Sequence, residues 1–460
     1  MKPLFDPSIH HIHLVGIGGN SMVAVAELLQ YQGYHITGSD RAENANVRRL
    51  IAEGIPVQVG HSREVIHGAD LIIHTSAVHD DNPEIQEAKR LGIPLMVRSS
   101  FFRLLTSQFP HSIAISGSHG KTTATSMAAV LLQKSPIPST LIIGASVPEI
   151  GGNISIGGGE LILNEACEFE ESFLDFDRDL AVILNIDRDH LDYYRDLAHI
   201  QDAFVTFANQ TREGGAVLVN AQDPPTQAIL NRIKRRIITF AVDEEADYRA
   251  DHVRIIEGQT LFAVSYRGEP IGEVALQVHG RHNVANALAA IACVHHYDKN
   301  VADYLPALAQ FQGAARRFDY HGKINGALCY DDFAHHPKEI EALLESIKEF
   351  YPDKRLIVGF QPHTYSRTKL LFDEHIHAFD AADEIWMMDI YAAREPFDPT
   401  IHTSMLIDAM VHKDITYTPD FEDLRDKMHE ELEENDVFFS VGCGDVNRIY
   451  DFVTLEREEK

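Results

Sequence analysis

A glycine-rich loop that ends in Lys-Thr-Thr is the strongest chemical signal in the chain, and it covers residues 117–123. Glycines let backbone amides approach phosphate oxygens closely, and the helix expected after the loop adds N–H donors and a partial positive charge. Lys121 can reach the outer phosphates of a nucleotide, and the Thr122 hydroxyl can bind Mg²⁺. A standard Walker A loop would have glycine where Ile115 stands, so this loop is a shorter variant. An ordinary tight turn is the plainer interpretation, but the Gly-Lys-Thr-Thr step between a strand and a helix favours a phosphate site.

A carboxylate and a histidine follow two apolar runs downstream of this loop. Glu165 comes directly after the run 161–164, and His190 comes shortly after the run 180–186. If both runs are strands that neighbour the strand before the loop, they bring Glu165 and His190 close to Lys121. Mg²⁺ prefers oxygen ligands, so Glu165 is a straightforward metal ligand and His190 a less usual one. Taken alone, either would be a solvated strand-end residue, and their shared position beside a phosphate loop favours a site.

A second glycine turn, at 16–19, follows the first predicted strand and precedes Asp40. This arrangement resembles the fingerprint of a dinucleotide-binding fold, so a nucleotide-linked dehydrogenase is one alternative function. The third glycine of that fingerprint is absent, with Ser21 in its place, and the loop around Lys121 has no role in a dehydrogenase. Titration with NADH separates the two functions, because a ligase should leave the fluorescence of NADH unchanged.

Short β-rich runs alternate with helical patterns along the whole chain, which favours parallel sheets with crossover helices. We predict an α/β fold with three domains, as expected for 460 residues at about 100–200 residues a domain. The domains are a Rossmann-like UDP-sugar-binding domain at 1–107, a central P-loop ATPase-like domain at 108–311, and a Rossmann-like C-terminal ligase domain at 312–460.

The third domain carries polar residues at the ends of its predicted strands. These strands are expected at 328–330, 356–359, 384–388 and 437–441, with the longest helix at 337–350. In open α/β sheets, ligands bind at the carboxyl ends of strands. Four polar loops at four strand ends therefore predict a binding site at this edge.

The composition limits the classes of partner. Lys and Arg number 40 against 69 Asp and Glu, a net charge of −29, which makes nucleic acid an improbable partner. No apolar run approaches the ~18 residues of a membrane span, and residues 1–13 lack the pattern of a secretory signal. We therefore expect a cytoplasmic protein with no membrane insertion.

Metal ligands elsewhere in the sequence form no recognisable site. The four cysteines are widely spaced without a CxxC pair, so neither a zinc cluster nor a disulfide framework is predicted. The histidines at 10, 11 and 13 could bind a metal, but we expect them to be exposed at the beginning of a strand.

Taken together, the motifs resemble those of the Mur ligase family, nearly from end to end. The resemblance is closest to the members that add L-alanine to UDP-N-acetylmuramate. One motif alone would be weak support, whereas the ordered set is highly specific. The motifs are Gly-Ser-Asp at 38–40, Gly-Ser-His-Gly-Lys-Thr-Thr at 117–123, Glu-Ala-Cys-Glu at 165–168, Asn-Ile-Asp-Arg-Asp-His at 185–190, Gly-Arg-His-Asn at 280–283, Arg-Arg-Phe at 316–318, Asp-Asp-Phe-Ala-His-His-Pro at 331–337, Gln-Pro-His-Thr-Tyr-Ser-Arg-Thr at 361–368 and Asp-Ile-Tyr-Ala-Ala-Arg-Glu at 389–395.

The resemblance implies an ATP-dependent ligase of peptidoglycan precursor synthesis. Such an enzyme forms an amide between the carboxylate of UDP-N-acetylmuramate and L-alanine through an acyl phosphate. ATP and Mg²⁺ are the implied cofactors, and the partners are these small molecules.

Positions in the motifs imply roles for individual residues. Contacts with the UDP-sugar are implied for Gly16, Gly18, Gly19, Ser39, Asp40 and Ser76. Contacts with ATP are implied for Gly117, Ser118, His119, Gly120, Lys121, Thr122, Thr123, His282, Asn283, Asn286 and Asp332. The implied metal ligands are Thr122, Glu165 and His190. The implied catalytic residues are Lys121, His335, Arg317 and Arg367, where His335 accepts the proton of the amine or, alternatively, is purely structural.

Three departures from the family pattern are visible. Ser21 stands in the first glycine turn where a glycine is usual, and Thr364 replaces a frequent arginine and is assigned no role. Many relatives use a carbamylated lysine soon after the metal histidine, but here no lysine occurs between His190 and Lys234. That absence matches the alanine-adding members.

Two further alternatives stay open beside the dehydrogenase. A related ligase could attach a recycled murein peptide instead of alanine, and an assay with alanine and a tripeptide decides between them. A non-catalytic module could retain a nucleotide-binding fold, although the presence of Lys121, Glu165 and His190 argues against it. ATP turnover that depends on the UDP-sugar would exclude such a module.

Overall fold

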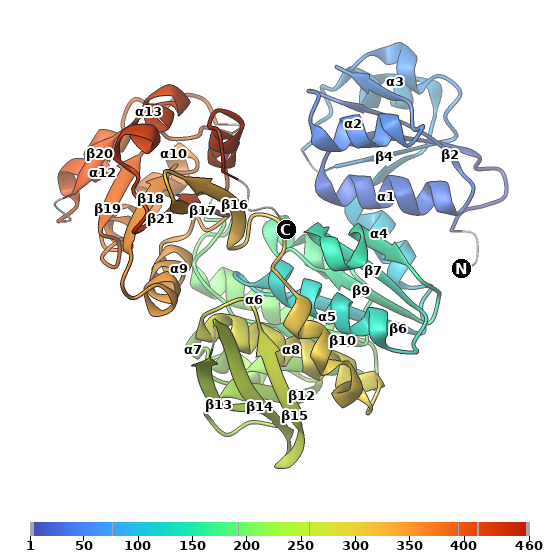
Figure 1. The fold of residues 1–460 in the computed structure, drawn as a ribbon. Coiled ribbons are helices and arrows are strands. Elements are labelled where there is room, and N and C mark those ends of the chain that lie inside the picture. Colours follow the sequence, from blue (N-terminus) through green and yellow to red (C-terminus); the bar gives the residue numbers. More distant parts are fainter. Residues whose placement is uncertain are drawn as a thin grey trace.

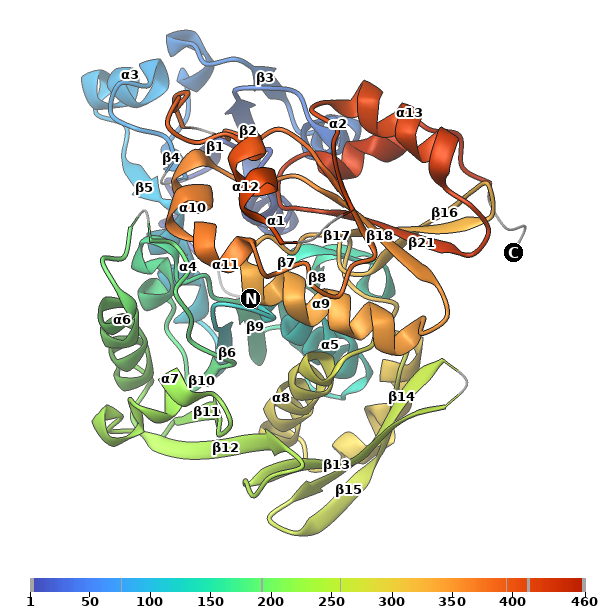
Figure 2. The same cartoon turned by 90° about the vertical axis from the view of Figure 1, so that its left-hand side faces the viewer.

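The computed structural model describes residues 4–75, 77–191, 193–256, 258–393, 395–411 and 414–456, which contain three β-sheets. Each sheet is the centre of one domain, and the N-terminal and third domains both lie against the central one (Figure 1). A view turned by 90° shows the same arrangement, with helices on both faces of the sheets (Figure 2). The predicted α/β class with three domains is confirmed.

The N-terminal domain is a parallel five-stranded sheet in the order β3-β2-β1-β4-β5. Alternate residues of β1 point to opposite faces, so Ile12 and Leu14 pack with Met22 and Leu29 of α1 in one buried cluster. Its elements are β1 (His11–Val15), α1 (Asn20–Tyr31), β2 (His35–Asp40), α2 (Ala45–Ala52), β3 (Val57–Val59), β4 (Leu71–His74), α3 (Pro83–Leu91), β5 (Leu95–Val97) and α4 (Arg98–Thr106).

The central domain has a ten-stranded sheet in the order β15-β14-β13-β12-β11-β10-β6-β9-β7-β8. The strands expected to carry Glu165 and His190 are β9 and β10, and they flank β6 as predicted. Strand β10 ends at Ile183, three residues earlier than expected. Its elements are β6 (His111–Ser116), α5 (Lys121–Lys134), β7 (Ser139–Val147), β8 (Gly152–Ile156), β9 (Leu161–Glu165), β10 (Leu180–Ile183), α6 (Leu197–Asn209), β11 (Ala216–Asn220), α7 (Pro224–Gln227), β12 (Arg236–Val242), β13 (Tyr248–Ile256), β14 (Gln259–Tyr266), β15 (Glu269–Leu276) and α8 (Arg281–Tyr297).

The third domain has a six-stranded sheet in the order β16-β17-β21-β18-β19-β20. Only the β16–β17 pair is antiparallel among its described pairs. Pro337 begins α9, the longest helix of this domain, at a position where a missing N–H costs nothing. Its elements are β16 (Asp319–Ile324), β17 (Ala327–Asp332), α9 (Pro337–Phe350), β18 (Arg355–Phe360), α10 (Tyr365–Leu370), α11 (Phe372–His375), β19 (Glu384–Met387), α12 (Thr403–Ala409), β20 (Ile415–Tyr417), α13 (Phe421–Glu431) and β21 (Asp436–Val441).

The described residues also bear on two predictions made from the sequence, which concern membrane spans and disulfide bonds. None of their helices combines the length and the apolar composition that crossing a bilayer requires. The four cysteines, Cys167, Cys293, Cys329 and Cys443, are all free thiols.

Candidate active site

The phosphate loop connects the end of β6 to the start of α5, and two of its glycines have positive φ. Gly117 has φ 149° and Gly120 has φ 79°, a left-handed conformation that other residues adopt at a cost. A Cβ atom at Gly120 would lie 2.6 Å from the Asn286 side chain. The local sequence therefore needs glycine here to place α5 and its first-turn amides at the end of the sheet.

Lys121 is folded back onto this loop and forms an ion pair within the central domain. Its Nζ donates to the carbonyl oxygens of Gly117 at 2.6 Å and Ser118 at 3.0 Å, and lies 2.9 Å from a carboxylate oxygen of Glu168. Burial opposes its charge, but the attraction of Glu168 outweighs it and raises the pKa of Lys121. Glu168 has no assigned role in the sequence analysis, although it stands in the motif that contains Glu165.

Glu165 is held at the end of β9 by two donors. The Thr122 hydroxyl donates to one carboxylate oxygen at 3.0 Å, and the Gly144 amide donates to the other at 2.9 Å. Thr122 and Glu165, two of the three predicted metal ligands, thus present oxygen atoms side by side. The hydroxyl–carboxylate pair has the hard donor atoms that Mg²⁺ prefers.

His190, the third predicted metal ligand, groups with different carboxylates. Its Nε2 lies 3.6 Å from Glu168 and 3.7 Å from Asp189, and the ligand atoms of these three residues lie within 4.8 Å of one another. His190 itself has φ 53°, a conformation that turns the chain sharply after Asp189. Glu168 therefore joins Lys121 to His190, which sequence spacing did not indicate.

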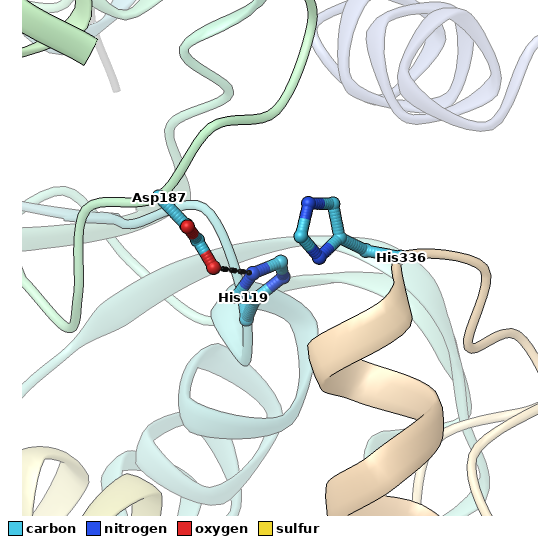
Figure 3. Close-up of side chains that lie close together, drawn as sticks. All are labelled: His119, Asp187 and His336. Carbon is cyan, nitrogen blue, oxygen red and sulfur yellow. Dashed lines mark hydrogen bonds and ion pairs between the residues drawn. The ribbon is translucent and has the colours of Figure 1, made fainter. Parts of the chain in front are cut away.

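His119 points at carboxylates rather than along the phosphate loop. Its Nε2 lies 3.2 Å from Asp187 and its Nδ1 lies 3.1 Å from Glu339 of α9. Burial disfavours its charge, yet Glu339 and Asp187 prevail and raise the pKa of His119 to about 9. Figure 3 shows the His119 ring facing Asp187, with His336 beside it from the start of α9, 5.0 Å away between ring centroids.

The loop after β10 makes ion pairs with the third domain at three consecutive residues. Asp187 lies 2.8 Å from Lys338, Arg188 lies 3.4 Å from Glu374, and Asp189 lies 3.2 Å from Arg367. The positive groups around Asp189 lower its pKa in spite of its burial. This loop therefore connects the phosphate loop to the third domain.

A cavity of about 440 Å³ lies between the central and third domains, and most of the residues predicted to contact ATP line it. Apolar and aromatic side chains such as Phe240, Val278 and Leu343 form part of its wall. Burial raises the pKa of Asp332 to about 6, although Arg317 lies 4.0 Å away and opposes the shift. The predicted residues along the cavity are His119, Gly120, Thr123, His282, Asn283, Asn286, Arg317 and Asp332.

A neighbouring cavity of about 330 Å³ contains Asp189, His190 and Arg367 in its walls, together with His363 and Glu395. Arg367 donates to His363 at 2.8 Å as well as to Asp189. The cavity therefore brings predicted metal and catalytic residues from two domains together.

His335 belongs to the third domain and lies near Glu339 and His363. Its Nδ1 is 3.4 Å from Glu339, and its ring centroid is 6.2 Å from that of His363. Burial lowers the pKa of His335 to about 3, although Glu339 opposes the shift. A neutral imidazole at this position can accept a proton.

Several loop residues use their side chains or amides internally. The Ser118 hydroxyl is buried and accepts from the Asp187 amide at 2.7 Å. In the N-terminal domain, the Gly18 amide donates to Asp40 at 2.8 Å, and the buried Ser39 hydroxyl donates to Glu84 at 2.7 Å. Gly16 and Gly19 form the turn before α1, and Ser76 lies outside the described residues.

The expectation that the early histidines are exposed is wrong for His13. Its side chain is fully buried, with Nε2 3.2 Å from Glu84 and Nδ1 2.8 Å from the Thr37 hydroxyl. His61 also contacts Glu84, at 2.9 Å. The buried carboxylate of Glu84 on α3 therefore contacts both His13 on β1 and His61. These contacts are long-range and have no local sequence signal.

Comparisons with known proteins agree with this architecture. Family models match residues 11–110 as the Mur ligase family catalytic domain, 115–294 as the Mur ligase middle domain, and 316–444 as the Mur ligase glutamate ligase domain. The UDP-N-acetylmuramate–L-alanine ligase of Caldanaerobacter subterraneus subsp. tengcongensis is 39% identical over 95% of this chain and 96% of its own. That of Alkaliphilus metalliredigens is 39% identical over 98% of both chains.

Solved structures extend the similarity to the fold. The crystal structure of the UDP-N-acetylmuramate–alanine ligase from Thermotoga maritima has a TM-score of 0.82 at 30% identity, covering 96% of this chain and 97% of its own. A murein peptide ligase from Psychrobacter arcticus has a TM-score of 0.71 at 22% identity, covering 96% and 98%, and shares the fold. The shared fold, together with 39% sequence identity over nearly the full length of two relatives, defines the class: this chain belongs to the Mur ligase family.

Proposed function

We propose that this protein is an ATP-dependent ligase that joins UDP-N-acetylmuramate to L-alanine in peptidoglycan precursor synthesis. The observation that supports it best is a continuous series of contacts between ionisable side chains. Lys121 pairs with Glu168 at 2.9 Å, His190 lies 3.6 Å from Glu168 and 3.7 Å from Asp189, and Asp189 pairs with Arg367 at 3.2 Å. This series connects the loop that would bind phosphate to the third domain.

ATP would occupy the cavity of about 440 Å³ between the central and third domains. Its apolar wall suits a flat base, and the side chains of Asn283 and Asn286 on α8 supply polar groups beside it. The triphosphate would extend toward the loop at 117–120, where amides of the loop and of the first turn of α5 donate to anions. Arg317 lines the same cavity and would add positive charge near the phosphates.

The donor set fits Mg²⁺. The Thr122 hydroxyl and the Glu165 carboxylate would hold the ion, and it would neutralise charge on the phosphates. His190, with Glu168 and Asp189, forms a second group of potential ligands.

In the first step, a carboxylate oxygen of the sugar acid attacks the γ-phosphorus of ATP, ADP leaves, and an acyl phosphate forms. Negative charge gathers on the transferred group, and fixed positive groups stabilise it. Lys121 stays protonated because the attraction of Glu168 outweighs the effect of burial and raises the pKa of the lysine. The incoming phosphates would compete with Glu168 for the ammonium group of Lys121.

In the second step, the amine of alanine attacks the carbonyl carbon of the acyl phosphate and inorganic phosphate leaves. The amino acid would occupy the cavity of about 330 Å³, with Arg367 available to its carboxylate. His335 would accept the proton that the amine loses. Burial keeps the imidazole neutral but weakens it as a base, and Glu339, 3.4 Å away, would offset that loss by favouring the protonated ring.

The proposal includes the organisation of the chain. We propose domain boundaries near residues 107 and 312, which separate the strands of the three sheets. The first domain would bind the UDP part of the substrate at the turn 16–19 and at Ser39, Asp40 and Ser76. A reaction that consumes ATP and supplies cell-wall precursors would take place in the cytoplasm.

The decisive experiment measures phosphate release from ATP with UDP-N-acetylmuramate and each amino acid in turn. L-alanine should give the highest kcat/KM, and omission of the UDP-sugar should abolish turnover. A reaction with a murein tripeptide in place of alanine tests the related peptide-adding activity. Turnover that is faster with the tripeptide than with L-alanine would overturn the proposed amino-acid substrate.

A further inference from the structure

A small cavity of about 70 Å³ lies between the N-terminal and central domains, directly beside Glu165. Helices α1 and α4 form one side of it, and strands β7 and β9 form the other. Its size suits a single small group rather than a whole sugar nucleotide. The polar side chains in its wall are Ser21, Arg98, Ser99, Glu165 and Ser172.

Arg98 is the cationic side chain of this wall. It is partly buried, has no hydrogen-bond or ion-pair partner among the described residues, and has a pKa that burial lowers. Arg103, five residues further along the same helix, pairs instead with Asp175 at 2.8 Å. A guanidinium that is partly removed from water without a bonded carboxylate can gain much from an anionic ligand.

The position of this cavity relative to Glu165 is fixed by contacts between the two domains. The Asn20 side chain, at the start of α1, donates to the Gly144 carbonyl oxygen at 3.0 Å. The Gly144 amide donates in turn to Glu165 at 2.9 Å, and Thr122 binds the other oxygen of that carboxylate. The cavity therefore opens where the first domain meets the proposed metal ligands.

We infer that Arg98 binds the carboxylate of the sugar acid and positions it for phosphorylation, an inference that rests on the proposed function. The acid must approach a phosphate held by Lys121 and Thr122, and Glu165 repels a second carboxylate at this position. A forked guanidinium offsets that repulsion and orients two carboxylate oxygens at once. The hydroxyls of Ser21 and Ser99 add neutral donors to the same volume, whereas that of Ser172 donates to the Cys167 carbonyl oxygen at 2.9 Å.

Calorimetry with two ligands tests the inference. UDP-N-acetylmuramate carries the carboxylate, whereas UDP-N-acetylglucosamine has the same nucleotide and a sugar without it. Arg98→Ala should weaken binding of the acid roughly 10–100-fold, the range for hydrogen bonds between charged groups, and leave the affinity for UDP-N-acetylglucosamine within about 2-fold. Arg98→Lys should give an intermediate loss, because it keeps the charge without the fork.

The matched control is Arg103→Ala, which removes a guanidinium from the same helix and should change neither affinity. Equal losses for both ligands in Arg98→Ala would show that the residue binds the diphosphate, and unchanged affinities would show that it binds no anion; either result overturns the inference. If thermal melting shows that Arg98→Ala does not fold, the two affinities are measured in Arg98→Lys instead. A loss for UDP-N-acetylmuramate that exceeds the loss for UDP-N-acetylglucosamine supports the inference, and equal losses or none overturn it. A failure of the proposed function would appear differently, as wild-type protein without alanine-dependent ATP turnover.

Discussion

Two glycine turns, 16–19 and 117–120, join a parallel strand to the start of a helix in neighbouring domains, yet they are equipped for different chemistry. Helix α1 begins with uncharged residues after the first turn, and the Gly18 amide is already bonded to Asp40. Helix α5 begins with Lys121 and Thr122, which contact Glu168 and Glu165. The local geometry is similar, and the residues at the ends of adjacent strands make the difference.

This contrast explains why a glycine turn alone is a weak guide to function. Both turns place helix amides at the carboxyl edge of a sheet, which favours a bound anion in either case. Among the residues that the structure describes, only the second turn has a lysine and two carboxylates within contact distance. Five substitutions would sharpen or break the comparison, and they follow in order of expected effect.

The largest effect is expected for Lys121→Ala. Removing the ammonium group from the phosphate loop should reduce phosphate release from ATP by at least roughly 1,000-fold, because phosphoryl transfer depends on positioned charge. Affinity for the UDP-sugar, measured by calorimetry, should change little. Lys134→Ala, at the exposed far end of the same helix, is the control and should retain full turnover. Normal phosphate release by Lys121→Ala would remove the distinction between the two turns.

Alanine in each turn should affect a different substrate. Gly120 has φ 79°, where a side chain costs about 1–2 kcal/mol, so Gly120→Ala should raise the KM for ATP roughly 10-fold. A Cβ atom at Gly18 would lie 2.9 Å from an Asp40 oxygen, so Gly18→Ala should raise the KM for the UDP-sugar instead. Steady-state kinetics with each substrate varied in turn measure both. Equal effects of both variants on one substrate would contradict separate roles for the turns.

His119 in the second turn should also stabilise the fold in a pH-dependent way, through its contact with Glu339 of the third domain. The pKa of His119 is raised from 6.5 to about 9, so its contribution to stability is complete below pH 6.5 and is lost as pH rises through about 9. His119→Asn should lower the free energy of unfolding by about 1 kcal/mol at pH 6 and by much less at pH 9.5. Urea denaturation at both values checks this. A difference that stays constant with pH would contradict a charged His119.

The smallest effect is expected for Asn20→Ala in the first turn. It removes the hydrogen bond to Gly144 across the domain boundary, which at this exposed position contributes about 0.5 kcal/mol. Affinity for the UDP-sugar should fall no more than about 3-fold, and the small change in unfolding free energy should be the same at pH 6 and pH 9.5. A large loss of ATP turnover would mean that this turn, too, shapes the reaction centre.

Local patterns were sufficient for much of the fold. The apolar run before the phosphate loop predicted β6, the start and end of α9 were predicted correctly at Pro337 and Phe350, and β9 and β10 flank β6 as expected. These elements depend on periodicity, capping and the rules of parallel sheets, which operate within short stretches. The roles of the individual site residues stay predictions until the variants above are measured.

Other features lay beyond local patterns. His13 was expected to be exposed but is buried against Glu84, which lies 71 residues further along the chain. Glu168 was assigned no role, yet it contacts both Lys121 and His190. Neither contact follows from spacing, because each requires the packing of a helix or loop against a sheet.

By itself, the order of residues determined which reactive side chains stand at the ends of strands, since alternating apolar and polar runs specify strands and loops over a few residues. Tertiary structure alone decided which carboxylate meets which cation. His119 and Glu339 are 220 positions apart and lie 3.1 Å from each other. Such pairs form only after whole domains have packed, because the buried apolar surfaces, and not the charges, set how the domains fit together.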